Sequence, residues 1–597
     1  MASDLGFKIT PAAFGVTRSF SGRRWHLRQA DEAVVRTLAN EYGISTSLAR
    51  VLAAREVAAG DIPDLLNPTL KRLLPEPFLL ADMERAVARV QTAIEANEKI
   101  AVFGDYDVDG SCSAALVHDY LGALGKPPRV YIPDRMTEGY GPSPRAMKTL
   151  REEGASLVIT VDCGATAKAA FETARDVGLD VVVLDHHATE ALPPALAHVN
   201  PNRAGDTSGL NHLCAAGVTF LFLVALNRSL RASGWFEKNG VVPPDLMDAL
   251  DLVGLATVCD VVPLTGVNRA FARGGLSRLG DLNRKGFAAL ARVAEAKPPF
   301  TAYHLGFVFG PRINAGGRVG KCSLGVELLT SIDDGQSDDV ALLLDTHNRE
   351  RQAIEAMILE DAIAMAGTQA NAPFLLAAKD GWHPGVVGIV AGRLKERFAK
   401  PAFVAGFEGG LGRGSARSVP GVDIGAIIRG AKDAGVIESG GGHAMAAGFG
   451  LTRDQLEGFS QYLAARFADL SSVVTDAFDL DLDVLLSASA ATPQFVSEME
   501  RLGPFGAGNV EPLVVLPDAR VVFADVVGKD HVRFRLAGGD GAWLDGISFR
   551  SAETSLGQGL LGARGQVIHA AGRLRADEWN GRIRVQLQLE DAALAGV

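Results

Sequence analysis

Short apolar runs that end in acidic residues recur in the first half of the chain. Residues 100–103, 156–161 and 180–184 are each bounded by polar or turn-forming residues, which is typical of buried strands. Residues 165–178, between the second and third runs, have the length and composition of a crossover helix. Because a strand–helix–strand unit of this kind joins parallel strands, the pattern predicts an α/β domain with a parallel sheet.

Acids and histidines gather where these predicted strands end. They are Asp105, Asp107, Asp109, Asp162, Asp185, His186 and His187. Open parallel sheets bind their ligands at the edge where the strands end, so we expect these side chains to lie close together. Aspartate is also a common turn residue, and one such loop alone is weak evidence. Carboxylates this close together repel one another unless a cation lies among them. A site of several carboxylates with an imidazole is better suited to a pair of Mn²⁺ or Mg²⁺ ions than to zinc.

One further acid joins this set of candidate ligands. Asp260 follows an apolar, helix-like run over residues 246–258.

In the second half of the chain, residues 338–366 combine apolar residues at helical spacing with charges elsewhere, which predicts one long helix. Two lobes joined by such a helix would leave a cleft between them that suits a single strand.

Several motifs resemble those of a known family. Residues 105–111, Asp162 and residues 185–187 are similar to the signature motifs of the DHH phosphoesterase superfamily, and GGGHAMAAG, residues 440–448, resembles its companion DHHA1 domain. The remaining motifs are GPRINAGGR, GSARS and LGPFGAGN, at residues 310–318, 414–418 and 502–509. Together these motifs narrow the similarity to the RecJ family of single-strand-specific 5′-to-3′ DNA exonucleases, from about residue 50 to the end.

The resemblance implies two divalent metal ions, Mn²⁺ or Mg²⁺, and a role for each candidate. Asp162 would bridge both ions, while Asp109, His186 and Asp260 would hold one and Asp107 would help to hold the other. The implied catalytic residues are Asp107, Asp109, Asp162, His186, His187 and Asp260. Asp105 is a further candidate ligand. At this motif the chain departs from the family pattern, because the superfamily often has a histidine earlier in the motif, where this chain has Phe103, which cannot bind a metal ion. His187 would contact the substrate phosphate, and Asp185 would either orient a ligand histidine or cap a helix.

Substrate-binding residues are implied in the second half of the chain. Ser415 and Arg417 would hold the 5′-terminal phosphate, and His443 would lie nearer the scissile bond. The glycine-rich backbone at Gly441 and Gly442 can approach phosphates closely. We interpret residues 310–318 as a flexible loop that presents Arg312 and Arg318, and the resemblance favours Arg318 as a substrate ligand.

The chain divides into five expected units, three to five being typical of 597 residues. They are an N-terminal extension packed on the catalytic core over 1–75, a DHH domain over 76–285, a connector with the long helix over 286–365, a DHHA1 α/β domain over 366–470 and a nucleic-acid-binding domain over 471–597. The last unit contains six short β-type runs, which predict a small antiparallel barrel of the OB type. Alternation places Arg533 and Arg535 on one strand face, and Trp543 and Trp579 are candidates for base stacking.

Composition and charge restrict the ligands and the cellular location that can be expected. Because the net charge is −11, a polyanion would have to bind to local clusters of basic residues. The apolar run over 218–226 is far shorter than a membrane span, and the first ten residues lack a signal core. Five cysteines without ligand spacing indicate reduced, packed thiols, so we expect a cytoplasmic protein.

The expected function is a single-stranded-DNA-specific 5′-to-3′ exonuclease that releases mononucleotides by two-metal-ion hydrolysis, in DNA repair and recombination. Its expected partners are single-stranded DNA, a helicase and a single-strand-binding protein, and we expect a monomer. One alternative is a phosphodiesterase for very short oligonucleotides or cyclic dinucleotides, which needs no grip on a long strand. Another is an inactive DNA-binding scaffold, which would have lost metal ligands.

Overall fold

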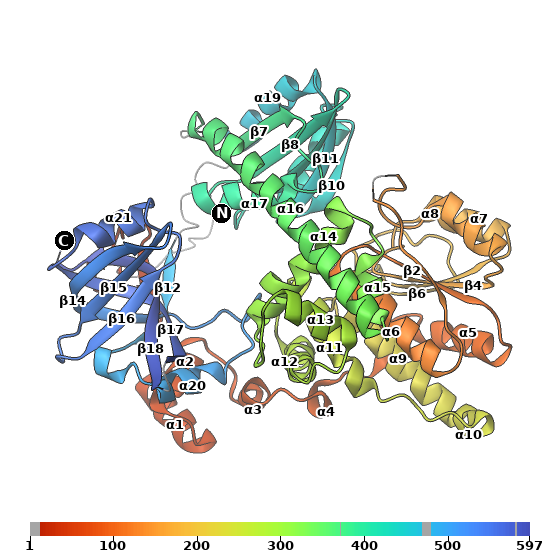
Figure 1. Ribbon diagram of the computed structural model, residues 1–597, viewed down its shortest axis with the longest axis horizontal. Helices are drawn as coiled ribbons and strands as arrows, with labels where there is room; N and C mark the ends of the chain where they lie inside the picture. Colours follow the sequence, from red (N-terminus) through yellow and green to blue (C-terminus); the bar gives the residue numbers. More distant parts are fainter. Residues whose placement is uncertain (1–11, 136, 370–371, 469–478, 580–581, 597) are drawn as a thin grey trace, which may run out of the picture.

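A computed structural model describes residues 12–135, 137–369, 372–468, 479–579 and 582–596. Figure 1 shows a parallel-sheet domain on the right, a second α/β lobe at the top, a helical region between them, and a barrel on the left. The predicted architecture of two α/β lobes joined by a long helix, with a C-terminal barrel, is confirmed.

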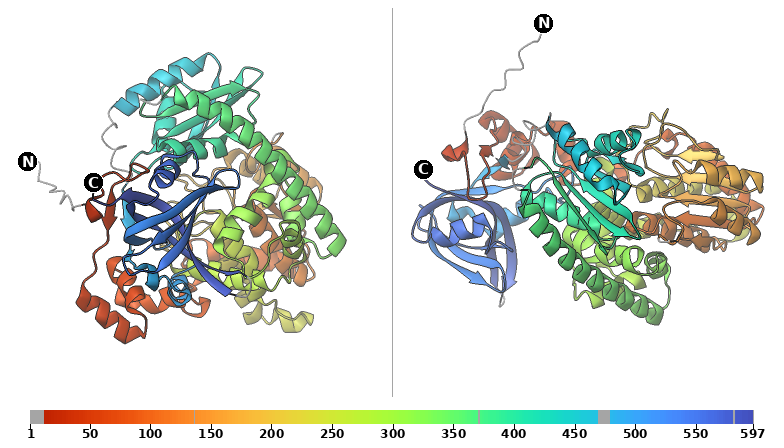
Figure 2. Two further views of the ribbon diagram at one scale, coloured as in Figure 1. Left: turned by 60° about the vertical axis from the view of Figure 1, so that its left-hand side comes forward. Right: turned by 90° about the horizontal axis from the view of Figure 1, so that it is seen from above.

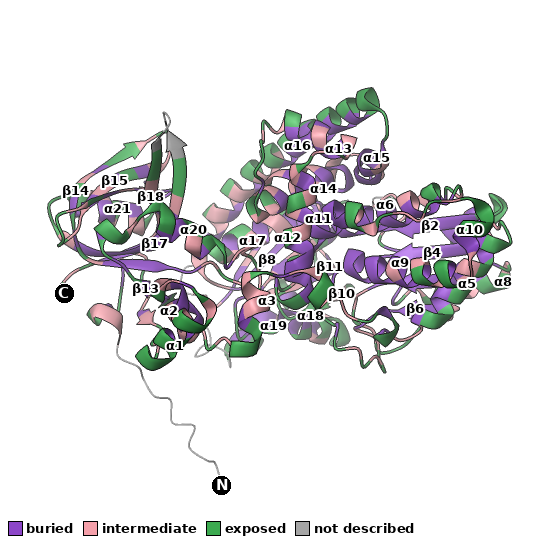
Figure 3. Cartoon of the chain, turned by 90° about the horizontal axis from the view of Figure 1, so that it is seen from below, coloured by how far each residue is buried: buried purple, intermediate pink, exposed green. Residues whose placement is uncertain are grey.

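The first lobe is built on a parallel sheet in the order β3-β2-β4-β5-β6. Its strands are β2 (Ile100–Gly104), β3 (Arg129–Tyr131), β4 (Leu157–Val161), β5 (Asp180–Leu184) and β6 (Ala197–Val199). Apolar side chains on both faces are buried, as a sheet covered on both sides requires (Figure 3). Its helices are α5 (Met83–Glu95), α6 (Val108–Ala123), α7 (Pro144–Glu152), α8 (Lys168–Asp176), α9 (Ala215–Ala232) and α10 (Trp235–Asn239).

Helix α9 contains the apolar run over 218–226 and extends beyond it at both ends. Its 18 residues are long and apolar enough to cross a membrane by length and composition alone. However, 72% of them are buried, and Phe220, Leu221 and Phe222 belong to the core of the first lobe. Its apolar character is therefore that of a core helix.

A helical region follows the sheet and carries the connection to the second lobe. Its elements are η4 (Leu246–Ala249), α11 (Leu250–Cys259), α12 (Gly266–Gly280), α13 (Lys285–Val293), η5 (His304–Phe309), α14 (Gly310–Val319), α15 (Leu324–Thr330) and α16 (Asp334–Gly367). Helix α16 is the predicted long helix, 34 residues long. The expected loop over 310–318 is wrong, because these residues form α14. Gly317 serves packing there, since a β-carbon on it would lie 3.1 Å from the ring and carbonyl oxygen of Tyr106.

The second lobe has a mixed sheet in the order β10-β11-β9-β8-β7, in which β7 and β8 are parallel and the other pairs are antiparallel. Aromatic rings such as Phe403, Phe449 and Phe459 fill the core on one face. The elements are β7 (Leu375–Asp380), α17 (Val387–Phe398), β8 (Ala402–Glu408), β9 (Leu411–Arg417), α18 (Ile424–Asp433), β10 (Ser439–His443), β11 (Ala446–Thr452) and α19 (Gln455–Ala468).

The C-terminal domain is a closed barrel, because β14 pairs with both β15 and β17. Its strands are mostly antiparallel, but β16 and β18 pair in parallel, unlike the expected all-antiparallel barrel. Val532, Phe534 and Leu536 are buried while Arg533 is exposed, as the alternation predicts. The elements are β13 (Val484–Leu485), η6 (Ala488–Ala490), α20 (Pro493–Glu500), β14 (Val514–Val527), β15 (His531–Ala537), β16 (Trp543–Ser548), α21 (Ser555–Gly562), β17 (Val567–Trp579) and β18 (Arg582–Leu594).

The N-terminal extension up to Leu66 packs on the barrel, which corrects the expectation that the extension packs on the catalytic core (Figures 1 and 2). Its end, at Leu70 and Leu74, packs on the core of the first lobe as expected. β1 (Trp25–Leu27) pairs in parallel with β12 (Leu480–Leu482), and the buried Trp25 indole donates to Asp591 at 2.9 Å. Helices α1 and α2 share a core with the barrel. The N-terminal elements are η1 (Ala13–Gly15), α1 (Glu32–Tyr42), α2 (Thr46–Ala54), η2 (Ala59–Asp61), α3 (Ile62–Leu66), α4 (Leu70–Leu73) and η3 (Pro77–Leu79).

Candidate metal centre and strand-binding cleft

The Asp-rich loop after β2 is fixed by hydrogen bonds and by close packing. Asp107 is the N-cap of α6, and its Oδ1 accepts from the Gly110 backbone N–H at 3.0 Å. A β-carbon on Gly110 would lie 2.5 Å from the Asp105 carbonyl oxygen, so only glycine fits this position. From α14, the Asn314 side chain accepts from the backbone N–H of Val108 at 3.1 Å. The connector therefore holds the loop that carries the acids.

Asp109 is buried against the start of α9. Its two carboxylate oxygens accept from the backbone N–H groups of Ala215 and Ala216, at 2.6 and 2.8 Å. Burial and the charge of Asp107 nevertheless raise the pKa of Asp109 to about 7. The carboxylate is thus oriented by a helix N-terminus and still lacks full compensation for its charge.

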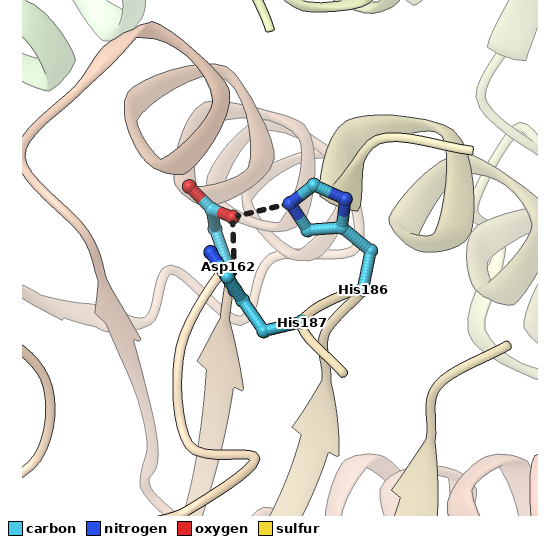
Figure 4. A group of neighbouring side chains, drawn as sticks. All are labelled: Asp162, His186 and His187. Atoms are coloured by element: carbon cyan, nitrogen blue, oxygen red, sulfur yellow. Dashed lines mark ion pairs between the residues drawn. The ribbon is translucent and has the colours of Figure 1, made fainter. Parts of the chain in front are cut away.

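Asp162 directly follows β4 in a left-handed backbone conformation with φ 58°. Aspartate tolerates this region better than most residues, and strained backbone of this kind is concentrated at functional sites. The Tyr140 hydroxyl donates to the Asp162 carbonyl oxygen at 3.3 Å, and the backbone N–H of Asp162 donates to Leu184. These bonds hold the residue so that its side chain faces the two histidines (Figure 4).

His186 lies among three carboxylates. Its Nε2 is 3.3 Å from Oδ1 of Asp162 and 3.8 Å from Oδ2 of Asp109, and its Nδ1 is 3.7 Å from Oδ2 of Asp260. Burial and the neighbouring charge of His187 lower the pKa of His186 to about 4. A neutral imidazole is the form that binds a metal ion.

Asp185 orients His187 and not His186. The buried Asp185 carboxylate lies 2.8 Å from Nδ1 of His187 and accepts from the backbone N–H groups of Ala165, His186 and His187. Burial opposes ionisation, but these donors hold the pKa of Asp185 below its ordinary value. Burial likewise opposes the charge of His187, yet the bond to Asp185 raises its pKa to about 9. Asp185 therefore orients a histidine, but this is His187, the expected phosphate contact, and not the expected ligand His186.

The candidate ligands form three groups whose ligand atoms lie within 4.8 Å of one another. The groups are Asp105, Asp107 and Asp162; Asp109, His186 and Asp260; and Asp162, His186 and His187. Oδ1 of Asp105 and Oδ1 of Asp162 are buried and find no hydrogen-bond partner among the residues that the structure describes. Burial and mutual repulsion raise the pKa of Asp105 to about 8 and of Asp260 to about 9. Oxygen-rich donors of this kind fit divalent Mn²⁺ or Mg²⁺ ions, which would compensate the buried charge.

The cysteines near these ligands serve packing. All five cysteines fall within the described part of the chain and are free thiols. Cys163 donates to the Val161 carbonyl at 3.4 Å and Cys259 to the Leu305 carbonyl at 3.4 Å. Burial raises the pKa of both thiols, so neither is suited to be a nucleophile.

A cavity of about 590 Å³ lies between the two lobes and joins the metal-ligand acids to the second lobe. Its lining includes Asp105 and Asp107 from the first lobe, Arg318 from α14, and Ser415 and Arg417 from β9. Nη1 of Arg417 donates to Oγ of Ser415 at 2.7 Å, so these two predicted phosphate ligands form a pair. Gly388 on α17 leaves room for them, because a β-carbon there would lie 3.0 Å from both side chains.

Other predicted substrate residues are placed differently. The guanidinium of Arg312 donates to the Asp345 carboxylate at 2.9 Å and to the Val308 carbonyl at 2.7 Å. These bonds give Arg312 a structural role. Gly441, Gly442 and His443 continue β10 beyond Ser439 and Gly440, the two residues of that strand that line the cavity. His443 is exposed. Trp543 is 65% exposed, whereas the side chain of Trp579 lies outside the described residues.

Some residues of the cleft were not singled out from the sequence. Tyr106 lines the cavity, and the guanidinium of Arg135 lies 5.3 Å from the centre of its ring. Arg135 and Tyr140 also line the cavity, and both come from a segment rich in turn residues. The position of Tyr106 between two candidate ligands was the available signal. Nothing in the sequence around Arg135, apart from its turn-rich segment, indicated that its side chain would line the cleft.

Comparisons with known proteins agree with this site. Family models match residues 99–255 (DHH family, N-terminal domain), 371–469 (DHHA1 domain) and 482–591 (RecJ OB domain). The fold and the acidic centre thus define a DHH phosphoesterase, a metal-dependent hydrolase. More narrowly, the chain belongs to the RecJ family of single-stranded-DNA-specific exonucleases.

The relatives match over most of their length. The RecJ exonuclease of Escherichia coli is 35% identical, with 85% of this chain and 89% of that protein covered. The RecJ exonuclease of Bacillus subtilis is 33% identical, with 96% of this chain and 71% of that protein covered. The crystal structure of Thermus thermophilus RecJ with Mn²⁺ has a TM-score of 0.77 at 27% identity and covers 95% of this chain and 79% of its own. The same protein was solved with Mg²⁺, with a TM-score of 0.71.

Proposed function

We propose that this chain degrades single-stranded DNA from its 5′ end and releases mononucleotides by hydrolysis at two divalent metal ions. The observation that carries the proposal is the shared cavity between the lobes. It joins Asp105 and Asp107 on one side to Ser415 and Arg417 on the other. A strand end held by the second pair would present its first phosphodiester bond to the acids.

The metal ligands are divided between two ions in this proposal. Asp162 belongs to two of the groups of ligand atoms, which supports a bridging position. Asp109, His186 and Asp260 would hold one ion, and Asp105 and Asp107 the other. When bound, such a pair of ions activates water and stabilises charge on the attacked phosphate.

The side chains that surround the ions position the substrate. His187 is held by Asp185 and would donate a hydrogen bond to an oxygen of the scissile phosphate. Arg318, fixed by donation to the Gly385 carbonyl at 2.9 Å, lines the same cavity and would contact the next phosphate. Gly441, Gly442 and His443 remain proposed substrate ligands.

Arg417 and Ser415 would recognise the 5′ phosphate and so set the direction of digestion. A guanidinium donates to two phosphate oxygens at once, and a terminal monophosphate offers more oxygens and charge than an internal diester. The pair is pre-oriented by the bond between Nη1 and Oγ. A strand would therefore be cut one nucleotide at a time from this end.

The barrel supports action on long strands, because a phosphodiesterase for very short oligonucleotides needs no such domain. Retention of every candidate metal ligand argues against an inactive scaffold. We further propose that the chain acts as a cytoplasmic monomer in DNA repair and recombination. There it would work with a helicase that supplies single strands and with a single-strand-binding protein.

The test uses a 5′-phosphorylated, 3′-labelled single strand and the matching blunt duplex, each with Mn²⁺, Mg²⁺ or a chelator. We expect progressive shortening of the single strand alone, stopped by the chelator. Cleavage restricted to dinucleotides and trinucleotides would favour the short-oligonucleotide phosphodiesterase. Binding without cleavage under all metal conditions would favour the scaffold.

A further inference from the structure

Two aromatic rings are stacked on each other at the surface of the helical region. Tyr303 and Phe307 are 63% and 71% exposed. Their ring centres are 5.4 Å apart and their planes differ by 22°. The residues are four apart in sequence, so one helical turn brings them to the same face. Large apolar patches at the surface of a protein often mark binding sites, and two stacked rings supply part of such a patch.

The segment that carries the rings is rigidly held. Phe307 belongs to η5, a π-helical turn, and such turns are frequent at functional sites. The backbone N–H of Thr301, which precedes this turn, donates to Nδ1 of His304 at 3.0 Å. Below it, Phe309 and Phe300 are buried with ring centres 5.2 Å apart. The exposed rings therefore lie on a fixed base.

The rings lie close in the fold to a metal ligand. η5 packs on the end of α11, where Cys259 donates to the Leu305 carbonyl at 3.4 Å. A β-carbon on Gly306 would meet Val258 at 3.6 Å, so the two elements are in direct contact. Asp260 is the next residue after α11. The aromatic pair is thus attached to the segment that presents Asp260.

The same segment leads from the metal centre to the barrel domain. Val261, next to Asp260, is 68% exposed. Three residues further on, the backbone N–H of Leu264 donates to the Ala507 carbonyl at 2.7 Å. Ala507 belongs to the loop over 502–509 that enters the barrel, and Gly508 of this loop lies against Pro263. The segment after Asp260 therefore reaches from the acids to the loop that enters the barrel.

We propose that Tyr303 and Phe307 form a base-stacking platform for the single strand on the 3′ side of the scissile bond. This inference rests on the proposed function. Nucleobases stack on aromatic rings without regard to sequence, so the platform would hold any strand. Because the rings are already stacked and anchored, little conformational freedom is lost when a base is added. Paired bases have their faces covered by neighbours in the duplex, so the platform also favours unpaired strands.

The test measures strand affinity in a cleavage-deficient background. We would combine Asp162→Asn with Tyr303→Leu and Phe307→Leu, which keep an apolar surface but remove the π-faces. Phe78→Leu is the matched control, because Phe78 is an exposed ring on η3, in the first lobe. Fluorescence anisotropy would follow 5′-phosphorylated strands from two to twelve nucleotides, and 2-aminopurine placed at successive positions would report stacking.

We expect the double leucine change to weaken binding of the twelve-nucleotide strand by about 5-fold or more, with dinucleotide binding unchanged. The 2-aminopurine quenching should be lost at one or two consecutive positions only, and Tyr303→Trp with Phe307→Trp should retain it. If the double leucine variant bound strands of every length as tightly as the Asp162→Asn chain with both rings intact, the platform would be overturned. If these affinities were equal but the double leucine variant sedimented more slowly than the chain with both rings intact, the rings would instead belong to a contact between copies of the chain. If the unmodified chain left single strands intact with Mn²⁺, the proposed function would fail first.

Discussion

The carboxylate of Asp185 lies 2.8 Å from Nδ1 of His187, and both belong to the loop that follows β5. Asp185 also accepts from two backbone N–H groups of the same loop, those of His186 and His187. One buried acid therefore fixes the ring of His187 and the backbone of both histidines. It is a positioning residue for the His187 side chain and for the backbone that carries both histidines.

Asp185→Asn should lower kcat about 10- to 100-fold, as is typical when the partner of a site histidine is changed. The amide keeps the size of the side chain but loses the charge that orients His187. Asp180→Asn, at the exposed start of β5, is the control and should keep normal turnover. Steady-state digestion of a labelled single strand measures both variants. An unchanged kcat for Asp185→Asn would mean that His187 needs no such orientation.

Asp162→Asn should abolish cleavage while strand binding persists. Asparagine tolerates the left-handed backbone at φ 58°, so the change removes charge without adding backbone strain, unlike alanine. Calorimetry with Mn²⁺ should report fewer bound ions or weaker binding than in the unmodified chain. Retained turnover would refute the assignment of Asp162 as a metal ligand.

Arg417→Ala should remove the preference for a phosphorylated 5′ end. A charge-assisted hydrogen bond contributes about 1.5–3 kcal/mol, so the ratio of kcat/KM for 5′-phosphate and 5′-hydroxyl strands should fall about 10-fold or more. Arg397→Ala on α17 is the control, because Arg397 is exposed and lies away from the cavity lining. An unaltered ratio for Arg417→Ala would contradict the proposed phosphate site.

Arg284 joins the connector to the first lobe. Its guanidinium bonds to Asp251 at 2.9 Å, to Asp119 at 2.7 Å and to the Leu329 carbonyl at 2.7 Å. Arg284→Met should destabilise this part of the fold by about 3–5 kcal/mol, since it leaves the buried charge of Asp251 unpaired. Arg292→Met, which breaks an exposed pair with Asp338, should cost far less. Urea unfolding of both variants would compare them, and equal midpoints would refute the role of Arg284.

Acid should loosen the contact between the N-terminal extension and the barrel. Burial opposes the charge of Glu590, but Arg573 and Arg23 hold its pKa below 4.5. A lowered pKa gives stability that is present above about pH 4.5 and lost as pH falls through the folded-state value. Limited proteolysis of the N-terminal extension should therefore accelerate below that pH, and Glu590→Gln should accelerate it already at neutral pH. A rate for Glu590→Gln equal to that of the unmodified chain would contradict this.

Local patterns predicted the catalytic domain well and long-range packing poorly. The acids at the ends of β2, β4 and β5 could be found because strand ends and charge are both local features. The helix α14 was mistaken for a loop because its glycines looked like hinges, whereas Gly317 makes room for Tyr106. The pairing of β1 with β12 joins segments more than 450 residues apart, and no local signal announces it.

The central claim is that the cleft between the lobes digests a single strand from its 5′ end. The direct measurement uses two single strands of one sequence, one with nuclease-resistant phosphorothioate linkages at its 5′ end and the other with the same linkages at its 3′ end. With Mn²⁺, the account predicts that the 3′-protected strand is shortened to its protected segment, while the 5′-protected strand stays nearly intact. Rapid digestion of the 5′-protected strand would contradict it.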